Sequence, residues 1–279
     1  MLGRGPKFLG LAVITLAFAF AASARAADCG DSPEGFKAWL DGFRQVAIDG
    51  GISPDVVDNA LATATFDRSI LSHDRGQGSW QAARQTNFAA FAAAHVTAAR
   101  IKRGKAMLLA YAEPLDRIEQ RYGVPGAVLV AIWGLETDFG TGLGTYPTFS
   151  ALATLAYDCR RADFYRAELV AALTIVQRGL LTPEEMHGAW AGELGQTQFM
   201  PSAYLLYGVS SNGGRGADLM RNSADALAST ANFLRQKGWK RDAKWDPGDP
   251  NFAALLEWNA AEVYARTIAQ YADRLAESE

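Results

Sequence analysis

Glu136 stands at the end of an unusually apolar stretch of the sequence. The segment from Val124 to Leu135 has Pro125 near its start and no charged residue, so we expect a helix that is buried on every face. Partial desolvation and the negative end of the helix dipole would both raise the pKa of a carboxyl group delivered from that helix into the glycine-rich run 140–144. A carboxylic acid that stays protonated near neutral pH is what cleavage of a glycosidic bond requires. The alternative is an acid that only caps the helix or forms an ion pair.

A second segment, residues 188–202, combines small residues with amides and aromatic side chains. Small residues let the backbone approach a ligand closely, and amides can hydrogen-bond sugar hydroxyls or N-acetyl groups. This composition favours a glycan-binding loop. The alternative is a tight helix–helix contact that carries two surface glutamines.

Other chemistries find little support in the sequence. The chain has three histidines, His73, His95 and His187, and none of them forms the paired motif of a zinc protease. GxSxG, GxGxxG and GxxxxGK[ST] motifs are absent. The net charge of −3 and the lack of a basic stripe argue against a nucleic-acid partner. We therefore expect no cofactor and no metal.

The N-terminus has the pattern of a signal peptide. Positive residues in the first seven positions precede an apolar run over residues 8–22, and Ala24-Arg25-Ala26 matches a signal peptidase site. We expect cleavage after residue 26, which leaves residues 27–279 as an exported catalytic domain. An uncleaved anchor and a lipid-modified Cys29 are the alternatives. In an oxidising compartment Cys29 and Cys159 can form one disulfide, the alternative being two free thiols.

Helix signals dominate the rest of the chain, and no segment shows the sustained alternation of an exposed strand. Helices are expected over residues 33–49, from residue 54, within the alanine-rich stretch 81–111, after the capping box 182–185, over 223–237 and over 260–275. The fold class is therefore mainly α, in one unit with a substrate cleft.

The two chemical segments and their neighbours resemble the soluble and membrane-bound lytic murein transglycosylase B family. The matching strings are AIWGLETDFGTGLG, ALATLAYDCRRADFY, AWAGELGQTQFMPSAY, SADALASTANFLRQKGW and LLEWNAAEVYA. Their order and spacing extend the likeness from about Ser32 to Leu275.

The resemblance implies a lysozyme-like α-helical domain, a periplasmic location and peptidoglycan as the substrate. It implies cleavage of the MurNAc-β-1,4-GlcNAc bond with formation of 1,6-anhydromuramic acid, and it places the catalytic acid and base at Glu136. Arg160 and Arg161 would meet the lactyl or peptide carboxylates. The other substrate-facing positions that it implies are Gln198, Asn259 and Tyr264. Glycan strands and other cell-wall enzymes are the expected partners of a monomer.

Several positions depart from the family pattern. Ala189 and Phe233 stand where the family often has hydroxyl-bearing residues, and Glu193 stands where it often has a small one. The loop 210–215 lacks the carboxylates that a calcium site needs, and Asp218 is the one nearby acid. Two alternatives remain: a lysozyme-type hydrolase with Asp138 or Glu193 as a water-activating base, and a non-catalytic peptidoglycan-binding protein.

Overall fold

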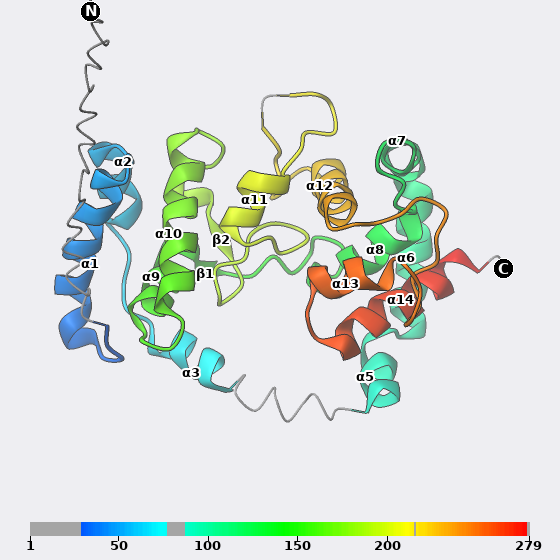
Figure 1. The fold of residues 1–279 in the computed structure, drawn as a ribbon, viewed down its shortest axis with the longest axis horizontal. Coiled ribbons are helices and arrows are strands. Elements are labelled where there is room, and N and C mark those ends of the chain that lie inside the picture. Colours follow the sequence, from blue (N-terminus) through cyan, green and yellow to red (C-terminus); the bar gives the residue numbers. More distant parts are fainter. Residues whose placement is uncertain (1–28, 77–86, 215, 278–279) are drawn as a thin grey trace, which may run out of the picture.

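The computed structural model describes residues 29–76, 87–214 and 216–277. Within these residues the chain is mainly helical, as predicted, and no helix is long and apolar enough to cross a membrane. The predicted signal peptide lies outside the described residues. Figure 1 shows two groups of helices, with the short helix α11 (Pro201–Tyr207) between them.

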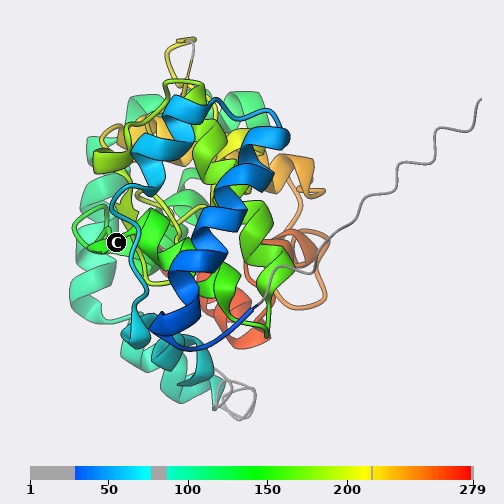
Figure 2. The ribbon, with the colours of Figure 1, turned by 90° about the vertical axis from the view of Figure 1, so that its left-hand side faces the viewer.

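The first group contains the N-terminal helices and the pair that follows the glycine-rich run. Figure 2 shows α1 on the outer side of this group, where it packs against α2 and α9, and α9 packs in turn against α10. The group consists of α1 (Pro33–Asp49), α2 (Pro54–Leu61), α3 (Arg68–Gly76), α9 (Thr148–Tyr157) and α10 (Ala162–Gln177).

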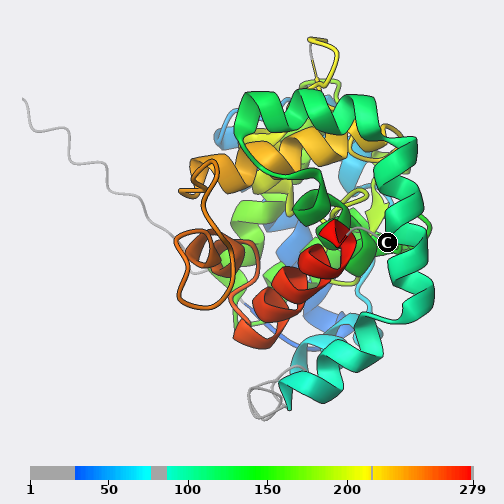
Figure 3. The same cartoon turned by 90° about the vertical axis from the view of Figure 1, so that its right-hand side faces the viewer.

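The second group surrounds α8 (Gly126–Thr137), which packs against α6, α7, α12 and α14. In Figure 3, α14 (red) runs diagonally across this face, with α7 along its upper edge and α6 along its right edge. Its other members are α5 (Phe88–His95), α6 (Ala98–Ala110), α7 (Ala112–Tyr122), α12 (Ser223–Gln236), α13 (Phe252–Trp258) and α14 (Glu262–Ala276). Because α11 packs against both α10 and α12, it joins the two groups.

Helix α8 is buried on nearly every side, as its apolar sequence predicts. Gly134 is required there, because a Cβ atom at this position would come within 2.9 Å of the Phe139 ring. The helix ends in two consecutive residues with left-handed backbone, Asp138 (φ 50°) and Phe139 (φ 63°). Arg103 holds this reversal, since it pairs with the Asp138 carboxylate and lies over the Phe139 ring. Glu136 therefore lies in the last turn of α8. This differs from the expectation that its carboxyl group enters the glycine-rich loop beyond the helix.

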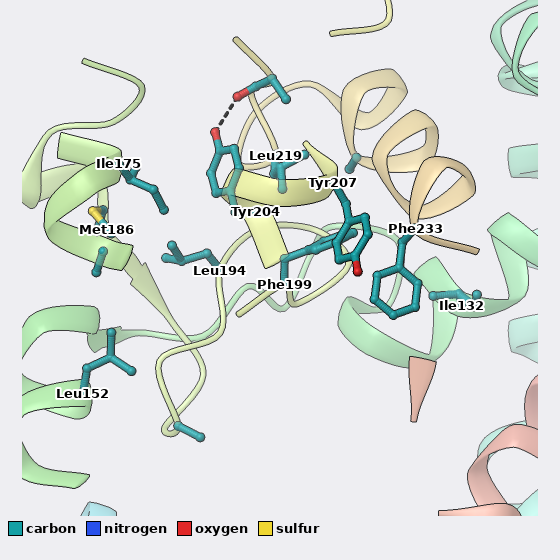
Figure 4. Packing of buried hydrophobic residues seen from close by; sticks show 14 of the residues in the cluster. Ile132, Leu152, Ile175, Met186, Leu194, Phe199, Tyr204, Tyr207, Leu219 and Phe233 are labelled. Atoms are coloured by element: carbon teal, nitrogen blue, oxygen red, sulfur yellow. Dashed lines mark hydrogen bonds between the residues drawn. The ribbon is translucent and has the colours of Figure 1, made fainter. Parts of the chain in front are cut away.

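The loop between α10 and α11 is anchored by buried side chains, although it has little regular structure. Within this loop the two-residue strand β2 (His187–Gly188) pairs antiparallel with β1 (Tyr146–Pro147), which precedes α9. Leu194 and Phe199 then exchange backbone hydrogen bonds and turn their side chains into the core. Figure 4 shows these side chains among those of Met186, Leu219 and Phe233. The loop is thus fixed by packing.

Three other predictions have a definite outcome. The described part of the alanine-rich stretch 81–111 holds two helices, α5 and α6, in agreement with the expectation of at least one, and Thr97 caps the start of α6 through a hydrogen bond from the Arg100 amide. The capping box at Thr182 is confirmed, but it opens only a 3₁₀ turn, Pro183–Glu185. Cys29 and Cys159 form the expected disulfide, with their Cα atoms 5.1 Å apart. It ties the start of the described chain to the segment between α9 and α10.

Candidate active site

The carboxyl group of Glu136 has two hydrogen-bond donors. The indole Nε1 of Trp258 donates to Oε1 at 3.0 Å, and the hydroxyl group of Tyr264 donates as well. The pKa of Glu136 is raised to about 7. Burial is the largest cause, and the charge of the Glu193 carboxylate also raises the pKa, whereas the two hydrogen bonds lower it. Desolvation, which the apolar sequence of α8 predicted, is the largest of these causes. Glu136 is therefore poised to give and to receive a proton near neutral pH.

The two donors lie on either side of the turn between α13 and α14, with Tyr264 in the first turn of α14. Trp258 is the last residue of α13, and its ring meets the rings of Phe199 and Phe233 edge-on at 5.3 and 5.1 Å. Asn259 follows in extended conformation, and its Oδ1 accepts a hydrogen bond from the Ala261 amide at 3.0 Å. This side chain fixes the turn that carries Tyr264 back to Glu136.

Glu136 opens into a cavity of about 410 Å³. The end of α8, the loop 189–200, α11, α12 and the end of α13 form its walls. Its lining residues are Glu136, Ala189, Glu193, Gln198, Phe199, Met200, Ala203, Phe233, Glu257, Trp258 and Asn259. The structure thus brings Gln198 and Asn259, two of the residues implied by resemblance, into one cavity with Glu136.

Gln198 connects two loops that border the cavity. Its backbone is left-handed (φ 55°), and its Nε2 donates to the carbonyl oxygens of Gly195 at 2.8 Å and Leu143 at 3.2 Å. The second contact ties the glycine-rich run to the loop 189–200. A further tie comes from Thr137, whose hydroxyl donates to the Gln196 carbonyl. These contacts fix the end of α8 against the loop.

Arg160 and Arg161 do not line this cavity. Both bind the carboxylate of Asp74 in α3, Arg160 at 3.0 Å. Asp74 is 2% exposed, whereas each arginine side chain is 45% exposed. One carboxylate neutralises only one of the two guanidinium groups, so the cluster keeps a net positive charge and accessible N–H donors. Arg161 also lies over the Tyr165 ring, 5.0 Å from its centre.

An aromatic group that the sequence did not reveal lies beside this cluster. His73 follows Leu71 and Ser72 on α3, directly before Asp74, and its ring stacks on Trp190 with the centroids 5.8 Å apart. The His73 Nε2 and the Tyr146 hydroxyl form a hydrogen bond of 3.1 Å. Ala189, the neighbour of Trp190 in the chain, lines the cavity, and Asp74, the neighbour of His73, binds both arginines.

The two candidates for a second carboxylate have different surroundings. Asp138 forms ion pairs with Arg100, at 3.6 Å, and with Arg103. Glu193 lines the cavity, and burial raises the pKa of its carboxyl group. Only Glu193 therefore shares the cavity with Glu136.

The acids near the loop 210–214 bind protein groups. Asp225 accepts hydrogen bonds from Ser211 and from the Asp218 amide, while Asp218 accepts from the Met220 amide and from Arg221. The described part of the chain holds no group of three or more histidine, cysteine, aspartate or glutamate residues arranged to bind a metal.

The helical fold and the buried glutamate in its cavity define the class of protein. The chain belongs to the transglycosylase SLT domain family, whose model matches residues 35–249. It is similar to membrane-bound lytic murein transglycosylase B of Escherichia coli, with 34% identity over 145 residues. That match covers 52% of this chain and 40% of the E. coli protein, less than half of its length.

Solved structures agree with this family. One of them is SltB3 from Pseudomonas aeruginosa in complex with NAG-NAM-pentapeptide, which is 28% identical, with a TM-score of 0.79. The match covers 88% of this chain and 80% of the SltB3 chain. Another is the E. coli lytic transglycosylase Slt35 in complex with bulgecin A, which is 23% identical, with a TM-score of 0.73. The match covers 85% of this chain and 92% of the Slt35 chain. The fold is thus that of lysozyme-like lytic transglycosylases, as the motifs implied.

Proposed function

We propose that this protein is a peptidoglycan lytic transglycosylase that cleaves the β-1,4 bond between N-acetylmuramic acid and N-acetylglucosamine. The observation that carries the proposal is Glu136, a carboxyl group with a pKa of about 7 and two hydrogen-bond donors, in a cavity large enough for sugar units. The complex of the related SltB3 with NAG-NAM-pentapeptide supports a glycan carrying a peptide as the ligand.

The reaction uses Glu136 twice. The protonated carboxyl group gives its proton to the bridging oxygen, so the C–O bond breaks and the N-acetylglucosamine end leaves as an alcohol. The substrate's own N-acetyl oxygen supports the positive charge at the muramyl C1. Glu136, now a carboxylate, takes the proton of the muramyl C6 hydroxyl, whose oxygen bonds to C1. The product is 1,6-anhydromuramic acid, and no water is consumed.

Trp258 and Tyr264 assist the second half of this cycle. Their hydrogen bonds stabilise the ionised form of Glu136, which exists only after the proton has left. Burial strongly raises the pKa of Tyr264, so this residue stays protonated and donates at neutral pH. The two donors therefore offset part of the desolvation cost, while the pKa of Glu136 stays high enough for the group to hold a proton near neutral pH.

The remaining assignments extend the proposal along the substrate. Gln198 and Asn259 border the bound sugars, and the exposed donors of Arg160 and Arg161 bind lactyl or stem-peptide carboxylates. Residues 1–26 are a cleaved signal peptide, residues 27–279 form the catalytic domain, and the protein acts in the periplasm as a monomer. Other cell-wall enzymes are proposed as partners.

Digestion of purified sacculi tests the proposal. The released muropeptides are expected to end in 1,6-anhydromuramic acid, which is lighter by one water than a reducing end and resists borohydride. Mass spectrometry before and after borohydride treatment measures both properties. Mainly reducing ends would identify a hydrolase, a second candidate that the presence of Glu193 in the cavity favours. Sacculi that are bound but not cleaved would identify a binding protein.

A further inference from the structure

The cavity around Glu136 is lined by acids and not by bases. Three of its described lining residues are glutamates, and none is lysine, arginine or histidine. Glu257 is largely exposed and forms an ion pair with Lys237 at 2.8 Å, and Glu136 has its two donors. The third glutamate, Glu193, has neither a lysine partner nor two such donors, so the role of its charge has to be explained.

The Glu193 carboxyl group has little to neutralise it. The backbone amides of Ala191 and of Glu193 itself lower its pKa, but burial has the larger effect and raises it. Oε2 is buried and has no hydrogen-bond partner. Ionisation of a carboxyl group costs free energy when one of its oxygens is buried without a hydrogen-bond partner, because the hydrogen bonds to water that it loses are not replaced. The raised pKa of Glu193 has the same physical cause.

The arginine whose charge acts on Glu193 forms no ion pair with it in the described part of the chain. Arg161 attracts the Glu193 carboxylate, but it is engaged by Asp74 and lies over the Tyr165 ring. The other charged or titratable groups that act on this region are Glu136 and Tyr165, and the charge of Glu193 raises the pKa of both. Among the described residues, the cavity thus holds a carboxyl group that has no counter-ion.

We propose that Glu193 binds a free ammonium group of the glycan, and that the cavity takes, beside the N-acetylmuramyl unit that reacts at C1, a hexosamine unit that has lost its N-acetyl group. The inference rests on the proposed function in that the ligand is a glycan. An ammonium group brings the missing positive charge together with N–H donors, whereas an acetamido group brings one neutral N–H. The ion pair is neutral overall, so Glu136 can keep its proton while the pair is formed.

Binding measurements separate this selection from catalysis. Glu136→Gln protein provides an uncleaving background in which the amide imitates the neutral acid. Calorimetry at pH 6.5 would compare the β-1,4-linked tetramer of glucosamine with that of N-acetylglucosamine. We expect Glu193→Gln, added to this background, to weaken binding of the glucosamine tetramer about tenfold, the size of one lost charge-assisted contact. Binding of the acetylated tetramer should change less than about threefold, because Gln keeps a hydrogen-bonding group.

Matched variants make the result specific. Glu257→Gln removes an acid from the same cavity that already has a lysine partner, and it should affect neither tetramer. Glu193→Ala, checked by circular dichroism, should lose the glucosamine preference as Glu193→Gln does. An equal loss for both tetramers, no loss for either, or no binding of the glucosamine tetramer would each overturn the proposal. Clearing of murein by the unmodified protein is scored separately, so the proposed function can survive any of these results.

Discussion

The Trp258 indole donates to Oε1 of Glu136 at 3.0 Å, although 122 positions separate the two residues in the sequence. Because this contact and the one from Tyr264 both favour the carboxylate, while burial favours the acid, the proton affinity of Glu136 is a balance of opposed effects. Several outcomes can be expected from that balance.

Glu136→Gln should abolish murein clearing while the fold persists. An amide cannot donate a proton as a carboxylic acid does, and general acid–base catalysis typically contributes about 10²–10⁴-fold. The measurement is turnover on labelled sacculi, with a thermal melt as the control for folding. Near-normal turnover by the variant would end the assignment of Glu136 as the catalytic acid.

The reaction rate should fall as the pH rises through about 7, because the proton-donating form of Glu136 is then lost. Trp258→Phe removes a hydrogen bond that stabilises the ionised form, so it should raise the pKa of Glu136 and move this alkaline limb to higher pH. The pH profile of kcat/KM for both proteins measures the shift. A shift to lower pH would contradict the role given to the indole.

Glu136 should also make stability depend on pH. Its pKa in the folded protein, about 7, lies above the unfolded value of 4.5. Below pH 4.5 the group is neutral in both states and does not reduce the free energy of unfolding. That free energy falls as the pH rises through about 7, because the unfolded state releases the proton more readily. Glu136→Gln should therefore match the wild type at pH 4 and exceed it at pH 8, by at most about 3 kcal/mol before solvent screening in the cavity. Urea unfolding at both pH values measures this, and equal stability at pH 8 would contradict it.

Arg161→Gln should weaken the binding of substrates that carry carboxylates. We expect KM for peptide-bearing murein fragments to rise about tenfold with kcat little changed, since the contact is made equally in ground and transition states. Lys37→Gln removes a cation from an exposed pair on α1 and serves as the matched control. Unchanged KM values for peptide-bearing and peptide-free fragments alike would show that the pair with Asp74 is only structural.

Calcium should not stabilise the protein. The carboxylates of Asp218 and Asp225 already accept hydrogen bonds from neighbouring groups, and an ion that binds only the folded state must raise the melting temperature. Thermal melts in millimolar calcium and in chelator are therefore expected to coincide. A clear upward shift with calcium would mean that the loop 210–215 and Asp218 rearrange to bind it.

The sequence predicted the parts of the site that depend on local pattern. The apolar run of α8 identified Glu136 and the cause of its raised pKa, and the motif order implied Gln198 and Asn259. Trp258 was missed, although it precedes Asn259 directly in a matching string, because only the folded chain brings an indole from α13 to the end of α8.

Ionic contacts between residues far apart in the sequence could not be predicted for the same reason. Nothing in the local pattern around Asp74 indicates that it binds both Arg160 and Arg161, which lie 86 and 87 positions away. The start of α6 at Thr97 could not be placed from the sequence, because a single threonine cap lies within an alanine-rich stretch of high helix propensity. The disulfide was predictable, since two cysteines allow only one intramolecular pairing.

The enclosure of α8 by its neighbours has a consequence for how the protein responds to heat. Amides in a helix covered on every side exchange with solvent only when most of the domain opens. Glu136, the proposed catalytic acid, belongs to that helix, whereas groups on surface loops can become disordered well below the melting temperature. Thermal inactivation should therefore coincide with global unfolding.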